Sequence, residues 1–161
     1  MFDPAWDEGC PVCSYQADSV GNLAHLHARN TTFAAVSRAP IGKIEPFRQR
    51  MGWSFPWYSS LGSDFNYNFH VTHDENIAPI EWNFMSNQGL VDAGMPYFAR
   101  PGEQGGISVF YGEGDAVLHT YAGCTIADLL CAADQYLDLT RLGRQDEQVE
   151  LRHHDKYASE S

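Results

Sequence analysis

Apolar residues recur at helical spacing in two stretches of the first third of the chain. After Cys10, apolar side chains at steps of three residues predict a helix over residues 11–27, with Gly21 as its weak point. Residues 41–51 repeat the pattern and end at Gly52, the residue type that commonly follows a helix. Pro46 should kink this second helix or move its start.

Strand-like runs follow each of these helices and return near the end of the chain. Residues 31–37 are β-branched and apolar without alternation, which favours a strand covered on both faces. Residues 55–60 predict a further strand limited by proline. Residues 107–111 and 116–122 are separated by "GEGD", which indicates an antiparallel hairpin.

The remaining segments differ sharply in pattern. Residues 73–106 lose clear periodicity and are broken by glycines and prolines, which is typical of a functional loop or an insertion. Residues 125–139 predict an amphipathic helix in which Thr125 is the N-cap and Asp128 takes the capping-box position. Residues 143–161 are charged and predict a solvated tail.

The order of these elements predicts the fold class. A dithiol, a βαβ unit, an insertion, a hairpin and a last helix are the parts of a thioredoxin-like three-layer α/β/α sandwich, here over residues 1–142 with the insertion at about 73–106. Only nine residues precede Cys10, so the strand that leads into such a site is expected to be missing. An open sheet edge favours a homodimer in which a second chain covers it.

The composition of the chain argues against some classes of partner and predicts a cellular location. The chain has 161 residues, of which 43% are hydrophobic, enough for one packed core. Its formal charge of −11 would repel phosphate backbones and anionic membrane surfaces, so neither nucleic acid nor a membrane is the expected partner. The sequence contains no apolar run near the roughly 20 residues of a membrane span and no signal-peptide pattern, so the predicted location is cytoplasmic.

The stretch "WDEGCPVCSYQ" carries the principal candidate for chemistry. A C-x-x-C pair at a helix start places Cys10 beside unpaired N–H groups that favour a thiolate, and Cys13 one turn further on. In this interpretation Cys10 attacks a disulfide and Cys13 resolves the mixed disulfide, without a metal or an organic cofactor. Asp7 and Glu8 would disfavour the thiolate if they point inward.

Zinc is the alternative interpretation of the cysteine pair. His25 and His27 are close in sequence, but residues two apart on a helix point in different directions and cannot face one metal. Cys124 and Cys131 lie seven apart and form no second close pair. Cys131 fits the apolar face of its predicted helix as a small buried residue.

Other candidates follow from the topology of an open α/β sheet. Ligands gather beyond the carboxyl ends of parallel strands, where Ser37 and Arg38 should emerge near Cys10. Arg38 could then offset the nearby carboxylates with a fixed positive charge.

Several blocks together resemble a known bacterial family. The blocks that carry the resemblance are "MFDPAWDEGCPVCSYQAD", "SRAP", "RMGW", "GSDFNY", "GISVFYGEGDAVLHTY" and "RHHDKY". The chain resembles the thioredoxin-like family known as the domain of unknown function numbered eight hundred and ninety-nine. The resemblance implies a dithiol-disulfide oxidoreductase whose cysteine pair matches Cys10 and Cys13. Thioredoxins place a cis-proline opposite the dithiol. The corresponding position in this sequence is occupied by residues 104–106, which contain no proline. The resemblance therefore implies that Gly106 lies in the wall that faces the substrate.

The expected function is thiol-disulfide exchange with a disulfide-containing protein or a small-molecule thiol. A non-catalytic binding module of the same fold is the alternative, motivated by the aromatic residues Trp53, Trp57, Trp82 and Tyr97. A peroxiredoxin is a further alternative, but its P-x-x-x-T-x-x-C signature does not occur before Cys10.

Overall fold

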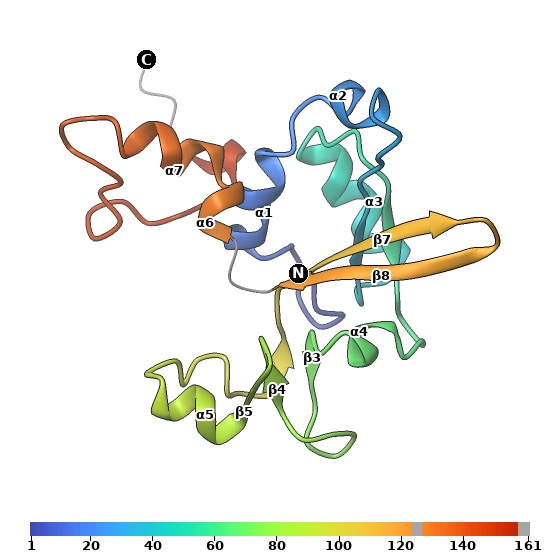
Figure 1. Cartoon of the computed structure of the whole chain (residues 1–161). Coiled ribbons are helices and arrows are strands. Elements are labelled where there is room, and N and C mark those ends of the chain that lie inside the picture. The colour runs from blue at the N-terminus through green and yellow to red at the C-terminus, as the bar shows by residue number, and fades with distance from the viewer. Residues whose placement is uncertain (124–126, 158–161) are drawn as a thin grey trace. The chain divides into compact units, whose positions relative to one another are not determined.

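The computed structural model describes residues 1–123 and 127–157 and has a mixed α/β fold with small sheets (Figure 1). The chain divides into two compact units: the first unit comprises residues 1–62 and 127–161, and the second unit comprises residues 63–126. Within the described ranges the strands form four sheets of two strands each. None of the helices in these ranges has the length and apolar character that crossing a membrane requires.

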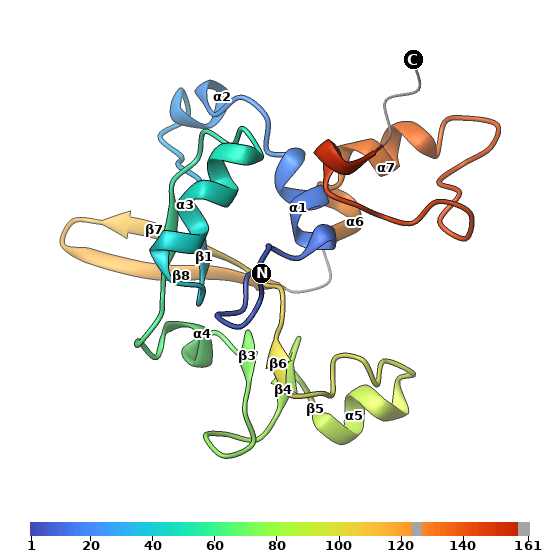
Figure 2. The ribbon, with the colours of Figure 1, turned by 180° about the vertical axis from the view of Figure 1, so that it is seen from behind.

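The first unit is built on a parallel βαβ element. Strand β1 (Ala35–Ser37) pairs in parallel with β2 (Trp57–Ser59), and α3 (Ile41–Arg50) connects them and packs against β2 (Figure 2). The predicted helix over 41–51 and the strand within 55–60 are therefore confirmed. Strand β1 is shorter than the predicted run, and Val36 is exposed, so the expectation of a strand covered on both faces is wrong within this unit.

Aromatic side chains make most of the core of the first unit. The buried cluster is Phe2, Ala39, Ile44, Phe47, Met51 and Trp57. The Phe47 ring lies 5.5 Å from the Phe2 ring and 6.0 Å from the Trp57 ring, measured between centroids. Helix α3 thus packs its apolar side against the amino-terminal segment, and Pro46 lies inside this helix without moving its start.

The helix predicted over residues 11–27 is two helices. Helix α1 (Pro11–Asp18) ends before a turn, and α2 (Ala24–His27) follows it as one short turn. Gly21 between them has φ +64°, a left-handed conformation that an α-helix cannot contain and that glycine adopts easily. The residue predicted to be a weak point is the place where the helix is interrupted.

The helix predicted over residues 125–139 is also divided. Helix α6 (Ala127–Leu130) and α7 (Ala132–Leu137) are separated by Cys131, whose backbone is extended at φ −89° and ψ 92°. Thr125, the predicted N-cap, and Cys124 lie outside the described residues. The views agree that α6 and α7 lie beside α1 (Figure 1), where Ala132 N–H donates to Ser19 Oγ over 3.0 Å.

The second unit contains short elements over residues 65–103, most of which lie where an irregular insertion was predicted over 73–106. They are α4 (Phe65–Asn68), β3 (Thr72–His73), β4 (Glu81–Trp82), β5 (Met85–Ser86), α5 (Asn87–Asp92) and β6 (Gly102–Glu103). Strands β3 and β6 pair antiparallel, as do β4 and β5. Trp82 is buried and stacks on Phe98 with ring centroids 3.8 Å apart, so these aromatics form a local core.

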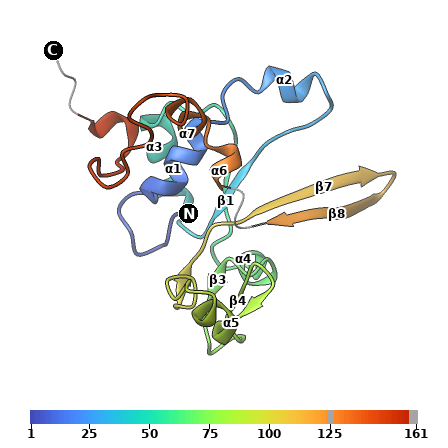
Figure 3. The ribbon, with the colours of Figure 1, turned by 60° about the vertical axis from the view of Figure 1, so that its left-hand side comes forward.

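The predicted hairpin is confirmed as a long two-stranded ribbon (Figure 3). Strand β7 (Ile107–Glu113) pairs antiparallel with β8 (Ala116–Gly123) through a turn in which Gly114 has φ +59°. The Phe69 ring packs edge-on against the Phe110 and His119 rings.

Candidate functional site

Cys10 occupies the N-cap position of α1. Its φ of −59° and ψ of 129° are non-helical, and Pro11 follows at the first helical position, where a missing N–H costs nothing. The Cys10 carbonyl accepts hydrogen bonds from the Ser14 backbone N–H and from Ser14 Oγ, each over 2.9 Å. These bonds fix the cysteine to the start of the helix, as the sequence predicted.

Cys13 lies one turn into α1 and forms a hydrogen-bonded thiol pair with Cys10. Both side chains are half-buried. The hydrogen bond to Cys10 lowers the pKa of Cys13 below its ordinary value, and the same bond, together with burial, raises the pKa of Cys10. A thiol that donates to a neighbouring thiolate stabilises one negative charge on the pair and opposes a second. The two sulfurs therefore share one ionisation that is easier than that of an isolated thiol.

The amino-terminal segment connects the dithiol to the carboxyl end of β1. Cys10 N–H donates to the Met1 carbonyl over 3.0 Å, and Ala39 N–H donates to the Phe2 carbonyl over 2.9 Å. Because Met1 and Phe2 are neighbours, the dithiol and the end of β1 are held on one short stretch of backbone. Ligand sites of open α/β sheets lie at this edge.

The three remaining predicted site residues have different surroundings. Ser37 is buried at the end of β1, and its hydroxyl accepts from Trp57 Nε1 over 2.9 Å, so it is held in the core of the first unit. Arg38 follows directly and is half-buried. Gly106 belongs to the second unit, where it directly precedes β7. All described peptide bonds are trans.

Glu8, two residues before Cys10, points to positive charges instead of to the dithiol. Its carboxylate contacts Arg50 and Lys156, each at 2.5 Å. Hydrogen bonds from Lys156 and Arg50 lower the pKa of Glu8 to about 2. Glu8 was expected to disfavour the Cys10 thiolate only if it pointed inward; instead its charge is compensated by Arg50 and Lys156. Asp7 is exposed.

A buried histidine from the predicted tail contacts the residue next to Cys10. His153 is only 3% exposed, and its Nε2 lies 2.8 Å from the Gly9 carbonyl oxygen. Its Nδ1 lies 3.0 Å from Arg50 Nη2. The expectation of a fully solvated tail is thus wrong for this part, which forms η1 (His154–Lys156) against the first unit.

Sequence reasoning missed Arg50, His153 and Lys156. The "RHHDKY" run mixes charges in a segment without apolar periodicity, which is the usual pattern of a solvated chain. A contact between residues 144 positions apart, such as His153 with Gly9, leaves no local signal. Within this run, only the adjacent histidines His153 and His154 indicated that the segment could contact the rest of the protein.

The described residues give no support to a metal centre. Within residues 1–123 and 127–157, no group of three or more histidine, cysteine or acidic side chains is arranged to hold an ion. Cys131 is 5% exposed, which agrees with its prediction as a small buried residue.

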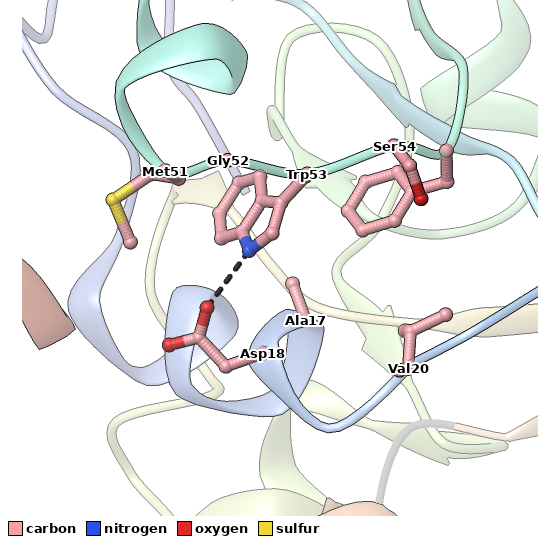
Figure 4. Close-up of a pocket in the computed structure, with 9 residues that line it drawn as sticks. Ala17, Asp18, Val20, Met51, Gly52, Trp53 and Ser54 are labelled. Carbon is pink, nitrogen blue, oxygen red and sulfur yellow. Dashed lines mark hydrogen bonds between the residues drawn. The ribbon is translucent and has the colours of Figure 1, made fainter.

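A shallow pocket lies at the opposite end of α1. It is formed by Ala17 and Asp18 of α1 and by the chain after α3, where Trp53 Nε1 donates to Asp18 Oδ1 over 2.8 Å (Figure 4). Its volume of about 230 Å³ is below the roughly 300 Å³ at which ligand pockets begin. Of the aromatic residues that motivated a binding module, Trp57 and Trp82 are buried in the cores of their own units, Trp53 lines this pocket and Tyr97 is exposed.

Comparison with protein-family models matches residues 1–157 to a family described as a bacterial protein of unknown function, DUF899. No curated protein and no solved structure matches the chain.

Proposed function

We propose that this chain, which belongs to the DUF899 family of bacterial proteins of unknown function, is a thiol-disulfide oxidoreductase in which Cys10 attacks and Cys13 resolves. The placement of Cys10 at the N-cap of α1, with Cys13 one turn further on, is the observation that carries this function. A pair that shares one easily formed negative charge supplies the thiolate that disulfide exchange requires.

The reaction follows from the position of that shared proton. Transfer of the proton from Cys10 to Cys13 along the S–H···S bond leaves the thiolate on Cys10 without changing the charge of the pair. Cys10 then attacks one sulfur of a substrate disulfide, forms a mixed disulfide and releases the other half as a thiolate. Cys13, after losing its proton to solvent or to the leaving thiolate, attacks Cys10 and releases the second half.

Two electrons pass from the dithiol to the substrate in this cycle, and the protein ends with a Cys10–Cys13 disulfide. A thiol reductant must therefore return the pair to the reduced form. The substrate class is a disulfide-containing protein or a small-molecule disulfide. The proposed compartment is a reducing one, because a close cysteine pair there is more often redox-active than structural. We also propose that the parallel β1–α3–β2 element belongs to a thioredoxin-like sheet, because such folds carry their dithiol at a helix start near the end of a parallel strand.

The test is reduction of glutathione disulfide and of insulin by the reduced full chain. Cys10→Ser should abolish turnover, and Cys13→Ser should accumulate the mixed disulfide at Cys10, detected by mass spectrometry of the intact protein. Cys131→Ser is the matched control, since that cysteine is buried at the start of α7 and is not part of the C-x-x-C pair. Turnover that survives Cys10→Ser unchanged would remove Cys10 from the mechanism.

A further inference from the structure

The peptide group that joins Gly9 to Cys10 is held at both of its polar atoms. Its carbonyl oxygen lies 2.8 Å from His153 Nε2, and its N–H donates to the Met1 carbonyl over 3.0 Å. Gly9 is buried against the Phe47 ring, since a Cβ at this position would lie 2.9 Å from Phe47 Cε1. The backbone immediately before the dithiol therefore has little freedom to rotate.

The Gly9 carbonyl can only accept, so the His153 Nε2 that faces it carries a proton. Nδ1 lies 3.0 Å from Arg50 Nη2, which can only donate, and further away, at 3.5 Å, from Glu8 Oε2, so Nδ1 accepts from Arg50. The proton is then on Nε2 and is donated to the Gly9 carbonyl. Arg50 is itself held by Glu8 and by Asp155, the latter at 3.0 Å. The ring is fixed in one tautomer and one orientation.

Two further contacts prevent the imidazole from moving away. Its ring packs edge-on against Phe47, with centroids 5.3 Å apart. The following residue, His154, contacts the Asp18 carboxylate at the other end of α1 at 2.9 Å. The segment that carries His153 is thus attached to both ends of the dithiol helix.

We propose that His153 is a positioning residue for the dithiol: by holding the Gly9 carbonyl it fixes the orientation in which Cys10 meets Cys13 and the first turn of α1. It does not contact either sulfur, so it acts through the backbone. Rotation of the Gly9–Cys10 peptide would turn Cys10 about its φ angle and move its sulfur away from its partner and from the helix N-terminus. This role rests on the proposed function of the cysteine pair.

Two substitutions separate the two hydrogen bonds of His153 in the full chain. His153→Gln places an amide donor at the ε position and retains the bond to Gly9. His153→Asn places its amide at the δ position, where it still accepts from Arg50 but does not reach Gly9. The readout is the rate of iodoacetamide alkylation of Cys10 and of Cys13 against pH, followed by peptide mass spectrometry on the reduced protein, with circular dichroism to confirm folding.

The Asn variant should shift the pH midpoint of alkylation upward by about one unit, which slows alkylation about tenfold at pH values below the midpoint and little above it. The Gln variant should keep the wild-type profile. His154→Gln is the matched control, since it lies in the same segment but contacts the far end of α1, and its profile should not change. A folded Asn variant with the wild-type profile would overturn the proposal.

Failure to fold is also decisive. If His153→Asn does not fold, His153→Gln and His153→Ala are compared, and a Gln variant that also fails to fold would overturn the proposal because the residue would then act through packing alone. Alkylation reports the thiolate without any disulfide turnover. A wild-type chain that reduces no disulfide would overturn the proposed function, whereas a slower Asn variant would still establish the positioning role.

Discussion

Lys156 and Glu8 are 148 residues apart in the chain and form an ion pair beside the dithiol. Glu8 also contacts Arg50, and Arg50 contacts Asp155, so two cations and two carboxylates alternate in one cluster. The cluster joins the residue two positions before Cys10 to the η1 segment and to α3. Its formal net charge is zero, so it holds the backbone near the dithiol without adding a net charge beside the thiols.

Glu8→Gln should make the stability of the protein less dependent on pH in acid. The pKa of Glu8 is lowered from 4.5 to about 2 in the folded protein, chiefly by hydrogen bonds from Lys156 and Arg50. Its contribution is therefore fully present above pH 4.5 and is lost as pH falls through about 2. Because Glu8 is partly exposed, we expect the variant to be less stable by only about 1 kcal/mol at neutral pH.

Urea unfolding of both proteins at several pH values measures this difference. It should shrink as the pH approaches 2, where the wild-type carboxylate is half-protonated. Glu147→Gln, at an exposed position, is the control. A difference between wild type and Glu8→Gln that is the same at every pH would contradict the ion-pair assignment.

Removing either cysteine of the pair should raise the midpoint of the first thiol ionisation above that of the intact pair. In the pair, one thiol donates to the other and stabilises the first negative charge. In Cys10→Ala or Cys13→Ala that donor is missing while burial still opposes the charge, so we expect a shift of about one to two pKa units upward. Thiolate ultraviolet absorbance against pH measures it, with Cys131→Ala as the control. Equal midpoints in the pair and in both single variants would refute the shared ionisation.

The elements that the sequence predicted correctly are those whose signal is local. The periodicity of α3, the Pro-limited strand β2 and the "GEGD" turn between β7 and β8 each depend on neighbouring residues, and all three are present. Helices broken by a single residue were harder to predict. The apolar spacing continues across Gly21 and Cys131, but the backbone does not remain helical at either residue.

The site shows the same division between local and long-range signals. The C-x-x-C spacing and Pro11 located the cysteines at a helix start, where the structure has them. The partners of Glu8 and Gly9 could not be predicted, because Arg50 and His153 reach them only after the chain folds back over many residues. Arg38 was predicted to offset Glu8 because it is near in topology, whereas the charges that pair with Glu8 come from α3 and η1.

Gly9→Ala should destabilise the protein by about 1–3 kcal/mol through overpacking. The added Cβ would lie 2.9 Å from Phe47 Cε1, and the Phe47 ring is confined by the Phe2 and Trp57 rings. Gly42→Ala is the matched control: its Cβ meets no atom within 4 Å, and alanine in a helix should stabilise by about 0.5–1 kcal/mol. Denaturant midpoints measure both, and a Gly9→Ala midpoint at or above the wild-type value would contradict the close packing of Gly9.

Tyr15→Phe should remove one connection between the dithiol helix and α7. Tyr15 Oη donates to Asp134 Oδ1 over 2.7 Å, so its loss should cost about 1 kcal/mol at neutral pH. Burial and the neighbouring Asp134 carboxylate raise the pKa of Tyr15 above its ordinary value of 10. A raised pKa means that the contribution of Tyr15 is fully present below pH 10 and is lost as pH rises through its higher folded-state value.

The wild-type protein should therefore lose stability in strong alkali more steeply than Tyr15→Phe, and the two curves of unfolding free energy against pH should converge there. Tyr136→Phe is the matched control, since Tyr136 lies on α7 with its side chain 75% exposed. Urea unfolding from neutral to alkaline pH measures the curves. Parallel curves for wild type and Tyr15→Phe would mean that the phenol contributes nothing that depends on its protonation, and the α1–α7 connection would then depend on packing and on the Ala132–Ser19 hydrogen bond.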